Sequence, residues 1–247
     1  MSNDYFQFKQ FLVKQERSVF KVGTDGVLLG AWATVDDTES ILDIGTGTGL
    51  IALMLAQRTE AIKQSQKANA RIVALEIERA SYEEALENVQ ASPWNDRITV
   101  ISQSFQDYSR GGPGIFDLIV TNPPFYRGSL KPQNYGKEIS RHDTSLRLTE
   151  LVSGMPKLLS QDGKFCVILP VEESEKVQQL GRLKDLFLVR MLLVRPTEKL
   201  PVKRHLLEFR RSPALEPDIS EIVIEGDARH EYTEPYRELT RDFYLAF

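Results

Sequence analysis

Cysteine and histidine are scarce in this chain, which has one cysteine and three histidines among 247 residues. A single thiol cannot form an internal disulfide bond, and scattered histidines without a second cysteine argue against a zinc site. Cys166 belongs to the apolar run 165–169, where we expect it to be a small, buried hydrophobic side chain. The sequence therefore predicts neither a disulfide framework nor a metal site.

Long hydrophobic runs are also absent. No apolar segment follows basic residues at the N-terminus, and no run approaches the roughly 20 residues that a membrane-spanning helix needs. We therefore expect no signal peptide, no membrane partner and a cytoplasmic location. The sequence shows no internal repeat and no linker rich in proline, glycine or serine. We expect a monomer with one globular unit at 39–247, preceded by a segment at 1–38.

Apolar strands and helical patterns alternate along the chain, which predicts an α/β fold with a mostly parallel sheet. The predicted strands are 41–44, 72–76, 98–101, 116–121, 164–169 and 186–194. The predicted helices are 49–58, 79–90, 104–109 and 145–160, the last ended by Gly163. The apolar run 206–209 is predicted to pair antiparallel with 186–194. The acid-rich stretch 216–238 is expected to be a solvated surface without a function.

The strand at 118–121 runs directly into Asn122-Pro123-Pro124-Phe125. Two prolines cannot donate backbone hydrogen bonds, so the strand must stop and the chain must turn. The Asn122 amide oxygen and the Pro123 carbonyl can both accept from one substrate NH₂, and the ring of Phe125 can stack on the planar group that carries it. This pattern predicts a catalytic turn, Asn122 to Phe125, that holds an exocyclic amine. The alternative is an ordinary strand-ending turn.

A glycine-rich turn lies upstream, with Gly45, Gly47 and Gly49 between a predicted strand and a predicted helix. Glycines at this spacing allow backbone torsions and close approaches that a Cβ would block, and the helix N-terminus behind them attracts polar or anionic groups. Asp43, at the end of the strand, is either a carboxylate that turn amides satisfy or a residue on the ligand side. The next strand ends in Glu76, which is placed to accept the ribose hydroxyls of an adenosine-containing ligand.

Together, the glycine-rich turn and the Asn-Pro-Pro-Phe turn resemble the class I S-adenosylmethionine-dependent methyltransferases, and among them the amino-methyltransferases with this motif. The similarity covers about residues 40–169. It implies a Rossmann-like, seven-stranded, mostly parallel sheet with an antiparallel final hairpin. It also implies S-adenosyl-L-methionine as the cofactor, with Glu76 on the ribose, residues 43–49 beside the methionine, and Asn122 close to both cofactor and substrate.

Two features differ from the usual pattern of these enzymes. The polar run 63–69 lengthens the connection to Glu76, so the assignment of Glu76 depends on its position at the end of a strand. The loop after the third strand often carries an aspartate that contacts the adenine amine. Here Ser104 occupies that position and Asp107 follows three residues later, so either can be the adenine contact.

The N-terminal segment indicates one family among these amino-methyltransferases. Residues 5–13 and 19–22 alternate apolar and polar side chains, which predicts a β-hairpin. The run 21–32 follows it and is expected to form a tight turn and a short helix. This run and the Asn-Pro-Pro-Phe turn resemble the bacterial tRNA1(Val) adenine N6-methyltransferases, which modify position 37 next to the anticodon. The resemblance extends to three spaced tyrosines: Tyr232, Tyr236 and Tyr244.

This resemblance implies that residues 21–26 close over the methionine end of the cofactor, with Lys21, Thr24 and Asp25 as polar contacts. A helix N-cap at Thr24–Gly26 is the alternative, and both can hold together. The implied partner is tRNA, bound at its anticodon stem-loop and methylated on N6 of adenosine 37. Trp32 and the tyrosines are expected to be core side chains.

Charge is distributed unevenly, although the net charge is only −4. Residues 182–211 contain nine Lys or Arg and three acids, and further basic residues follow the Pro-Pro turn. A basic rim beside an amine-holding turn suits RNA phosphates, and a mixed solvated surface is the alternative. We expect Phe125 to stack on the target base and three basic residues to contact the RNA: Arg127, Lys203 and Arg204.

Two other functions use the same turn. Ribosomal RNA guanine-N2 methyltransferases share Asn-Pro-Pro-Phe, and release-factor glutamine N5-methyltransferases carry Asn-Pro-Pro-Tyr. The latter typically have a separate helical N-terminal domain, whereas only residues 1–38 precede the first strand here. We therefore predict tRNA adenine N6-methylation, with the other two activities as alternatives.

Overall fold

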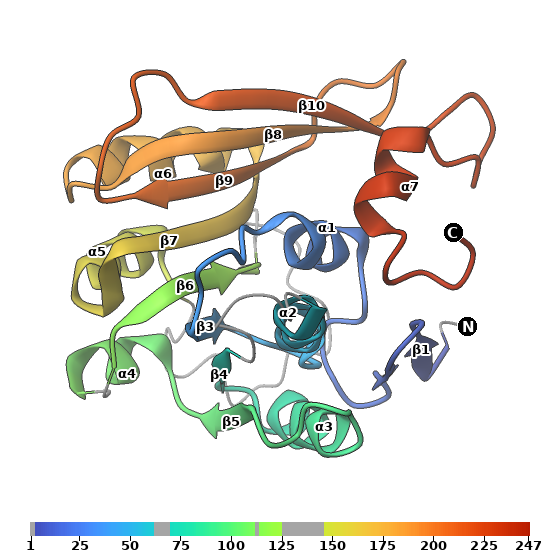
Figure 1. Cartoon of the computed structure of the whole chain (residues 1–247), viewed down its shortest axis with the longest axis horizontal. Helices are drawn as coiled ribbons and strands as arrows, with labels where there is room; N and C mark the ends of the chain where they lie inside the picture. The colour runs from blue at the N-terminus through green and yellow to red at the C-terminus, as the bar shows by residue number, and fades with distance from the viewer. Residues whose placement is uncertain (1–2, 62–69, 112–113, 125–145) are drawn as a thin grey trace.

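The structure of the chain, a computed structural model, describes residues 3–61, 70–111, 114–124 and 146–247. Over these ranges it contains an eight-stranded sheet, a separate two-stranded sheet and seven helices. The large sheet is the middle layer of the molecule and carries helices on both faces (Figure 1). No helix in these ranges has the length and apolar character needed to cross a membrane.

The strands of the large sheet lie in the order β10-β8-β9-β7-β6-β3-β4-β5. Their bounds are β3 Ser40–Ile44, β4 Arg71–Glu76, β5 Ile98–Ser102, β6 Phe116–Thr121, β7 Leu159–Pro170, β8 Phe187–Thr197, β9 Arg204–Arg210 and β10 Asp218–Glu225. β9 runs antiparallel to β7 and β8, and the other neighbouring pairs are parallel. The predicted α/β sheet with an antiparallel last hairpin is confirmed, and β10 adds an eighth strand to the predicted seven.

The helices pack on the two faces of this sheet. Their bounds are α1 Thr24–Trp32, α2 Leu50–Ala61, α3 Arg79–Gln90, α4 Phe105–Gly111, α5 Leu148–Leu158, α6 Val171–Arg182 and α7 Glu234–Thr240. Side chains alternate along β3, so Ile41 packs in the core formed with α1, α2, α3 and α7, whereas Leu42 packs with α4, α5 and α6. Strands that are apolar on both faces are typical of a sheet covered on both sides.

Two predictions about individual elements are wrong, and one helix was not predicted. α5 ends at Leu158 because Leu159 already pairs with Phe116, so Gly163 lies inside β7 and does not end a helix. The unpredicted helix is α6. The stretch 216–238 forms β10 and α7, and most of its residues are exposed, as predicted. The acids of β10 lie on an exposed edge strand, where they conceal the apolar alternation of that strand.

The second wrong prediction concerns the N-terminal hairpin. Its strands are β1 Tyr5–Gln7 and β2 Leu12–Lys14, which pair antiparallel. Residues 19–22 form no strand. They belong to a loop that the Gln15 side chain closes, because its Oε1 accepts a hydrogen bond of 2.8 Å from the Val22 amide.

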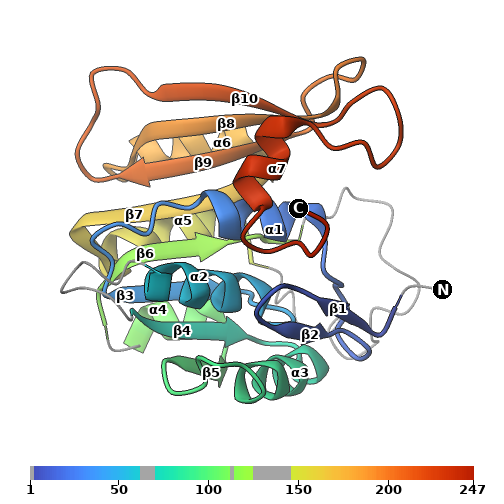
Figure 2. The same ribbon diagram turned by 45° about the vertical axis from the view of Figure 1, so that its right-hand side comes forward.

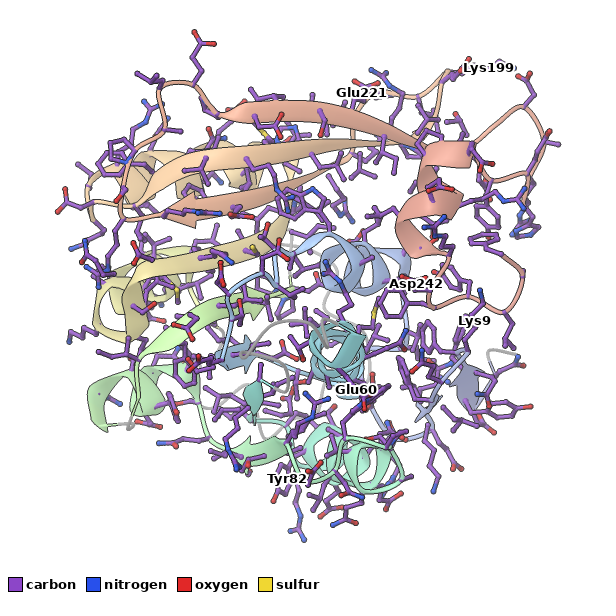
Figure 3. All side chains as sticks on the ribbon, viewed as in Figure 1. Lys9, Glu60, Tyr82, Lys199, Glu221 and Asp242 are labelled. Atoms are coloured by element: carbon purple, nitrogen blue, oxygen red, sulfur yellow. The ribbon has the colours of Figure 1, made fainter. Side chains whose placement is uncertain are left out.

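The N-terminal hairpin and the C-terminal segment lie side by side (Figures 2 and 3). The Lys9 amide donates to the Phe243 carbonyl at 2.9 Å. The Lys9 ammonium donates to the carbonyls of Arg241 at 2.6 Å and Phe247 at 2.7 Å. Phe8 forms an isolated β-bridge with Tyr244. Residues more than 230 positions apart therefore complete one packed unit, in which Tyr236 is buried as predicted.

Two half-buried arginines fix the C-terminal end of α1. Arg58 donates to the carbonyls of Gly30 at 3.0 Å and Ala33 at 2.6 Å, and Arg190 donates to the Trp32 carbonyl at 2.7 Å. Guanidinium groups satisfy the last carbonyls of a helix and oppose the negative end of its dipole. With this end held, the first turn of α1 faces the carboxyl ends of β3 and β6.

Candidate active site

The carboxyl ends of β3, β4 and β6 form the centre of the candidate site. β4 follows β3 through α2 on one side of β3, whereas β6, which comes later in the chain, lies on its other side. Such a reversal leaves a crevice at the carboxyl ends of the strands, where α/β proteins bind ligands. The predicted motifs meet at this edge, since Gly45 follows β3, Glu76 ends β4 and Asn122 follows β6.

The glycine-rich turn has the backbone that its sequence predicts. The φ angles are +70° at Gly45, +57° at Gly47 and +85° at Gly49, in the left-handed region that side chains disfavour. A Cβ on Gly45 or Gly47 would meet no atom within 4 Å, so the backbone there borders open space. A Cβ on Gly49 would instead contact Ala85 of α3 at 3.7 Å. The first two glycines thus form an open cradle, and the third allows close packing on α3.

Glu76 joins this turn to the start of α3. Its Oε2 accepts a hydrogen bond of 2.9 Å from the Gly47 amide, and its Oε1 accepts bonds of 2.8 Å from the amides of Ile77 and Glu78. The side chain is 8% exposed, and burial raises its pKa although the amide bonds oppose this. A carboxylate has about four acceptor positions, so one on Oε2 is left for a ligand hydroxyl.

Asp43 lies beneath the turn with no exposed surface. Its Oδ2 accepts a hydrogen bond of 2.6 Å from the Thr46 hydroxyl, whereas Oδ1 has no partner among the described residues. Burial raises the pKa of Asp43 to about 7, although the Thr46 bond acts in the opposite direction. A hydrogen bond from the Ala52 amide also lowers this pKa, so the protein satisfies part of the carboxylate. Both roles predicted for Asp43 stay predictions.

Asn122 is held at the end of β6, beside the glycine-rich turn. The Thr121 hydroxyl donates to the Ile44 carbonyl at 2.8 Å, which ties the end of β6 to the end of β3. A Cβ built on Gly26 would lie 3.9 Å from Asn122 Nδ2 and 3.0 Å from a methyl group of Leu50. The half-buried Asn122 amide and the first turns of α1 and α2 therefore meet at one point. Pro123 is buried and Pro124 is exposed.

The first turn of α1 carries an unpredicted ion pair. Asp25 and Arg204 were predicted to contact the cofactor and the RNA respectively, but they contact each other, with Nε and Oδ2 2.7 Å apart. The two side chains are 33% and 35% exposed, so the pair links α1 to the start of β9 at the rim of the site. Lys203 is exposed beside it.

Lys21 and Thr24 are exposed on the approach to α1. The N-cap residue of this helix is Gly23, and no side chain caps it with a hydrogen bond. Thr24, Asp25 and Gly26 therefore form the first turn, and the alternative of a side-chain cap at these residues is wrong.

Comparison with known proteins places the chain in a family. Residues 20–187 match the family described as methyltransferase small domain. A protein from Flavobacterium johnsoniae named tRNA1(Val) (adenine(37)-N6)-methyltransferase is 44% identical over 241 residues, which cover 97% of this chain and 99% of that protein. A protein of the same name from Bacteroides thetaiotaomicron is 44% identical over 99% of both chains. This chain belongs to the tRNA1(Val) (adenine(37)-N6)-methyltransferase family.

Solved structures share the fold at low identity. A protein from Agrobacterium tumefaciens described as a predicted O-methyltransferase has a TM-score of 0.65 at 15% identity and covers 89% of this chain and 96% of its own. A ribosomal-protein methylase from Lactobacillus delbrueckii subsp. bulgaricus has a TM-score of 0.55 at 17% identity, with 81% and 84% covered. The resemblance predicted from the motifs is thus confirmed for the fold and for the adenine-N6-methyltransferase family.

In this member of the family, the two predicted adenine contacts are bonded to each other. The Ser104 hydroxyl donates to Asp107 Oδ2 at 2.6 Å and accepts from the Asp107 amide at 3.0 Å, which is the geometry of a cap at the start of α4. Hydrogen bonds from Ser104 and Arg110 lower the pKa of Asp107. The Gln103 amide donates to the Glu76 carbonyl at 3.1 Å, so this loop lies beside Glu76. Which of the two residues contacts the adenine stays undecided.

Two predicted residues of the family site, Phe125 and Arg127, lie outside the described residues. The basic stripe at 182–211 is described, and much of it is engaged within the molecule. Arg190 and Arg210 pair with Glu208, Arg195 pairs with Glu221, and Lys199 pairs with Asp227. These contacts favour the mixed-surface alternative for most of the stripe and leave Lys203 as its exposed member at the rim. Figure 3 shows Glu221 along the edge strand β10 and Lys199 in the connection that follows β8.

The sequence analysis singled out neither Glu84 nor Asn88, two buried polar residues beside the glycine-rich turn. Both lie on the buried face of α3, with exposures of 1% and 2%. A signal for them exists, because the helical period of 79–90 places these polar residues at core positions, where a polar group needs a specific partner. Within the described ranges no group of three His, Cys, Asp or Glu is arranged to hold a metal ion.

Proposed function

We propose that this protein transfers a methyl group from S-adenosyl-L-methionine to the exocyclic N6 of adenosine 37 in tRNA1(Val). The observation that carries the proposal is the 44% identity, over nearly the full length of both chains, to relatives named for that reaction. The position of Asn122 at the end of β6, beside the glycine-rich turn, supports it with a chemical group suited to an amine.

The described residues fit the cofactor. The open backbone of Gly45 and Gly47 offers space against which a ligand can lie, and Asp43 Oδ1 is a buried acceptor without a partner among them. Glu76 keeps one acceptor position for a ribose hydroxyl. When bound, S-adenosyl-L-methionine supplies a methyl group already activated on a sulfonium, so the protein needs no nucleophile of its own.

The task of the protein is then to position and polarise the amine. The lone pair of an adenine amine is delocalised into the ring, which makes the nitrogen a poor nucleophile. The Asn122 amide oxygen and the Pro123 carbonyl would accept from both N–H bonds and favour the pyramidal nitrogen that forms in the transition state. Alignment of the two reacting groups can contribute roughly 7–11 kcal/mol.

The tRNA substrate would bind at the same rim of the crevice. A base must leave its neighbours to reach Asn122, and this is least costly in a single-stranded loop such as the anticodon loop. Phe125 would stack on it, for about 1–3 kcal/mol, while Arg127, Lys203 and the paired Arg204 would contact phosphates. We further propose that the enzyme acts as a monomer in the cytoplasm, with residues 1–38 covering the cofactor held by the unit 39–247.

The test is transfer of isotope-labelled methyl groups to three acceptors: unmodified tRNA, stripped ribosomal RNA and a release factor. N6-methyladenosine in tRNA, abolished by Asn122→Ala, is the expected result. A tRNA with guanosine at position 37 is the matched substrate control and should accept no label. N2-methylguanosine in ribosomal RNA or a methylated glutamine would instead support one of the alternatives and overturn the proposal.

A further inference from the structure

The α3 helix binds the N-terminal segment through a buried carboxylate. Glu84 Oε1 accepts hydrogen bonds from the amides of Glu16 at 2.7 Å and Arg17 at 3.0 Å, and Oε2 accepts one from the Ser18 amide at 2.9 Å. Three consecutive amides of a loop therefore converge on one side chain that is 1% exposed. Hydrogen bonds to a charged acceptor are stronger than those between neutral groups, so this loop is firmly held.

One turn further along the same face, Asn88 joins the segment to the glycine-rich turn. Its Oδ1 accepts from the Lys14 amide at 2.8 Å, and its Nδ2 donates to the Lys14 carbonyl at 2.9 Å. The same Nδ2 donates to the Thr48 carbonyl at 2.9 Å. A single buried amide thus holds β2 on one side and the backbone between Gly47 and Gly49 on the other.

The held segment leads directly to the rim of the site. Gln15 closes residues 15–22 into a loop through its bond to the Val22 amide, and α1 begins at Thr24. The first turn of α1 then reaches Asn122 and Leu50 at Gly26. The segment between Lys14 and Gly26 is therefore held at both ends, by α3 at Lys14 and by the residues of the crevice at Gly26. The tip carries Val19 and Phe20, which are 43% and 46% exposed.

We propose that Glu84 and Asn88 are positioning residues that hold residues 14–22 as a preformed wall of the cofactor pocket. This inference rests on the proposed function, since it concerns how the cofactor of that reaction is bound. A wall that is already ordered loses little conformational freedom when the ligand arrives, whereas a loose segment must be ordered at the expense of affinity. Neither residue needs to touch the cofactor, because both act through the backbone that they fix.

A purely structural role makes a different prediction. If the two side chains only stabilise the fold, their loss lowers the melting temperature but leaves cofactor affinity unchanged in the protein that is still folded. If they position the wall, affinity falls well below the melting temperature, while turnover at saturating cofactor is retained. The two roles are therefore separated by the split between KM for the cofactor and kcat.

The experiment measures binding of S-adenosylhomocysteine by calorimetry, and methyl transfer to tRNA, for Glu84→Gln and Asn88→Asp. Both substitutions keep the size of the side chain. The first places an NH₂ against amide donors, and the second removes the donor to the carbonyls of Lys14 and Thr48. We expect each to weaken binding and raise KM for the cofactor at least tenfold, with kcat within about twofold of wild type. Unchanged affinity together with a lower melting temperature would overturn the inference.

Glu87→Gln is the matched control. Glu87 lies on the same helix and contacts the side chains of Arg17 at 2.8 Å and Lys14 at 3.5 Å, but binds no backbone amide of the segment. Glu87 is 44% exposed, and we expect the Glu87→Gln variant to bind S-adenosylhomocysteine with the affinity of wild type. Absence of binding by the wild-type protein itself would contradict the proposed function and is thereby distinguished from failure of the inference.

Hydrogen exchange of the wild-type protein keeps the test independent of whether the variants fold. The amides of residues 14 and 16–18 should be protected from exchange without ligand, because their acceptors are present in the free protein. S-adenosylhomocysteine should then change their protection little. Free exchange that becomes slow only when the ligand is added would show a segment ordered by the ligand, which contradicts a preformed wall.

Discussion

Glu84 and Asp43 are carboxylates with almost no exposed surface, yet their surroundings differ. Burial by itself raises the pKa of both. At Glu84, hydrogen bonds from the backbone amides of residues 16–18 outweigh that effect and the pKa is lowered. At Asp43, hydrogen bonds from the Thr46 hydroxyl and the Ala52 amide do not outweigh burial, Oδ1 has no partner among the described residues, and the pKa rises to about 7.

The difference separates an anchor from a binding group. A buried carboxylate whose acceptor positions are filled by the protein stabilises the fold and has little left for a ligand. One with an unused oxygen weakens the fold when ionised, and such groups are concentrated at functional sites. Glu76, with three amides bound and one position open, lies between the two.

The largest expected effect follows from removing the anchor. Glu84→Ala leaves the amides of residues 16–18 without the buried carboxylate that accepts from them, and we expect the free energy of unfolding to fall by roughly 3–5 kcal/mol. Urea denaturation measures this change. Glu83→Gln, on the same helix and paired with the exposed Arg79, should give no measurable change. A loss of less than about 1 kcal/mol for Glu84→Ala would remove the distinction between anchor and binding group.

Asp43→Asn should affect stability in a pH-dependent way. The pKa of Asp43 in the folded protein is about 7, above the ordinary value of 3.8, so its stabilising contribution is complete below 3.8 and is lost as the pH rises to 7. Asparagine does not ionise. As the pH rises from 5 to 8, the free energy of unfolding of wild type should therefore fall by about 2–3 kcal/mol relative to that of the variant. Parallel pH profiles of the two proteins in urea denaturation would contradict a raised pKa.

A smaller effect is expected from proton exchange on cofactor binding. If the positive charge of S-adenosyl-L-methionine approaches the unused oxygen of Asp43, the pKa of that carboxyl must fall. At pH 7 about half of the Asp43 side chains carry a proton, so binding should release about half a proton per site. Calorimetry in buffers with different ionisation enthalpies measures this release. Asp43→Asn should abolish it, and a release that persists in the variant would assign the proton to another group.

The smallest effect on stability is expected at Asp25, which extends the comparison to a carboxylate that is one-third exposed. Its ion pair with Arg204 is screened by water, and Asp25→Asn should change the free energy of unfolding by less than about 1 kcal/mol. If Arg204 contacts RNA, its release from Asp25 should instead alter KM for tRNA several-fold. Arg204→Lys, which keeps the charge, provides the comparison. An unchanged KM for tRNA in both variants would exclude Arg204 from the RNA interface.

Local sequence patterns were sufficient for the centre of the fold and of the site. The strands from β3 to β6 are short apolar runs with clear ends; the glycine turn and Asn122 directly follow two of them, and Glu76 ends a third. Because parallel strands end at one edge of the sheet, neighbouring motifs in this pattern must come together in space. The prediction therefore required only the correct order of the elements.

Contacts that depend on distant segments could not be predicted in the same way. The acids of β10 became interpretable only when that strand was found beside β8, where Glu221 meets Arg195. Arg204 and Asp25 were given separate roles because nothing local shows that β9 starts beside α1. Likewise, Glu84 and Asn88 have no visible purpose until residues 14–18 lie across α3.

The contact between the two ends of the chain has a consequence for the order of events during synthesis. The hairpin that precedes residues 14–22 is held by carbonyls of residues 241–247, which lie more than 230 positions later in the chain. On the ribosome, the hairpin must therefore wait until these later residues have emerged before it can dock. A nascent chain is expected to acquire its full cofactor affinity only after that point.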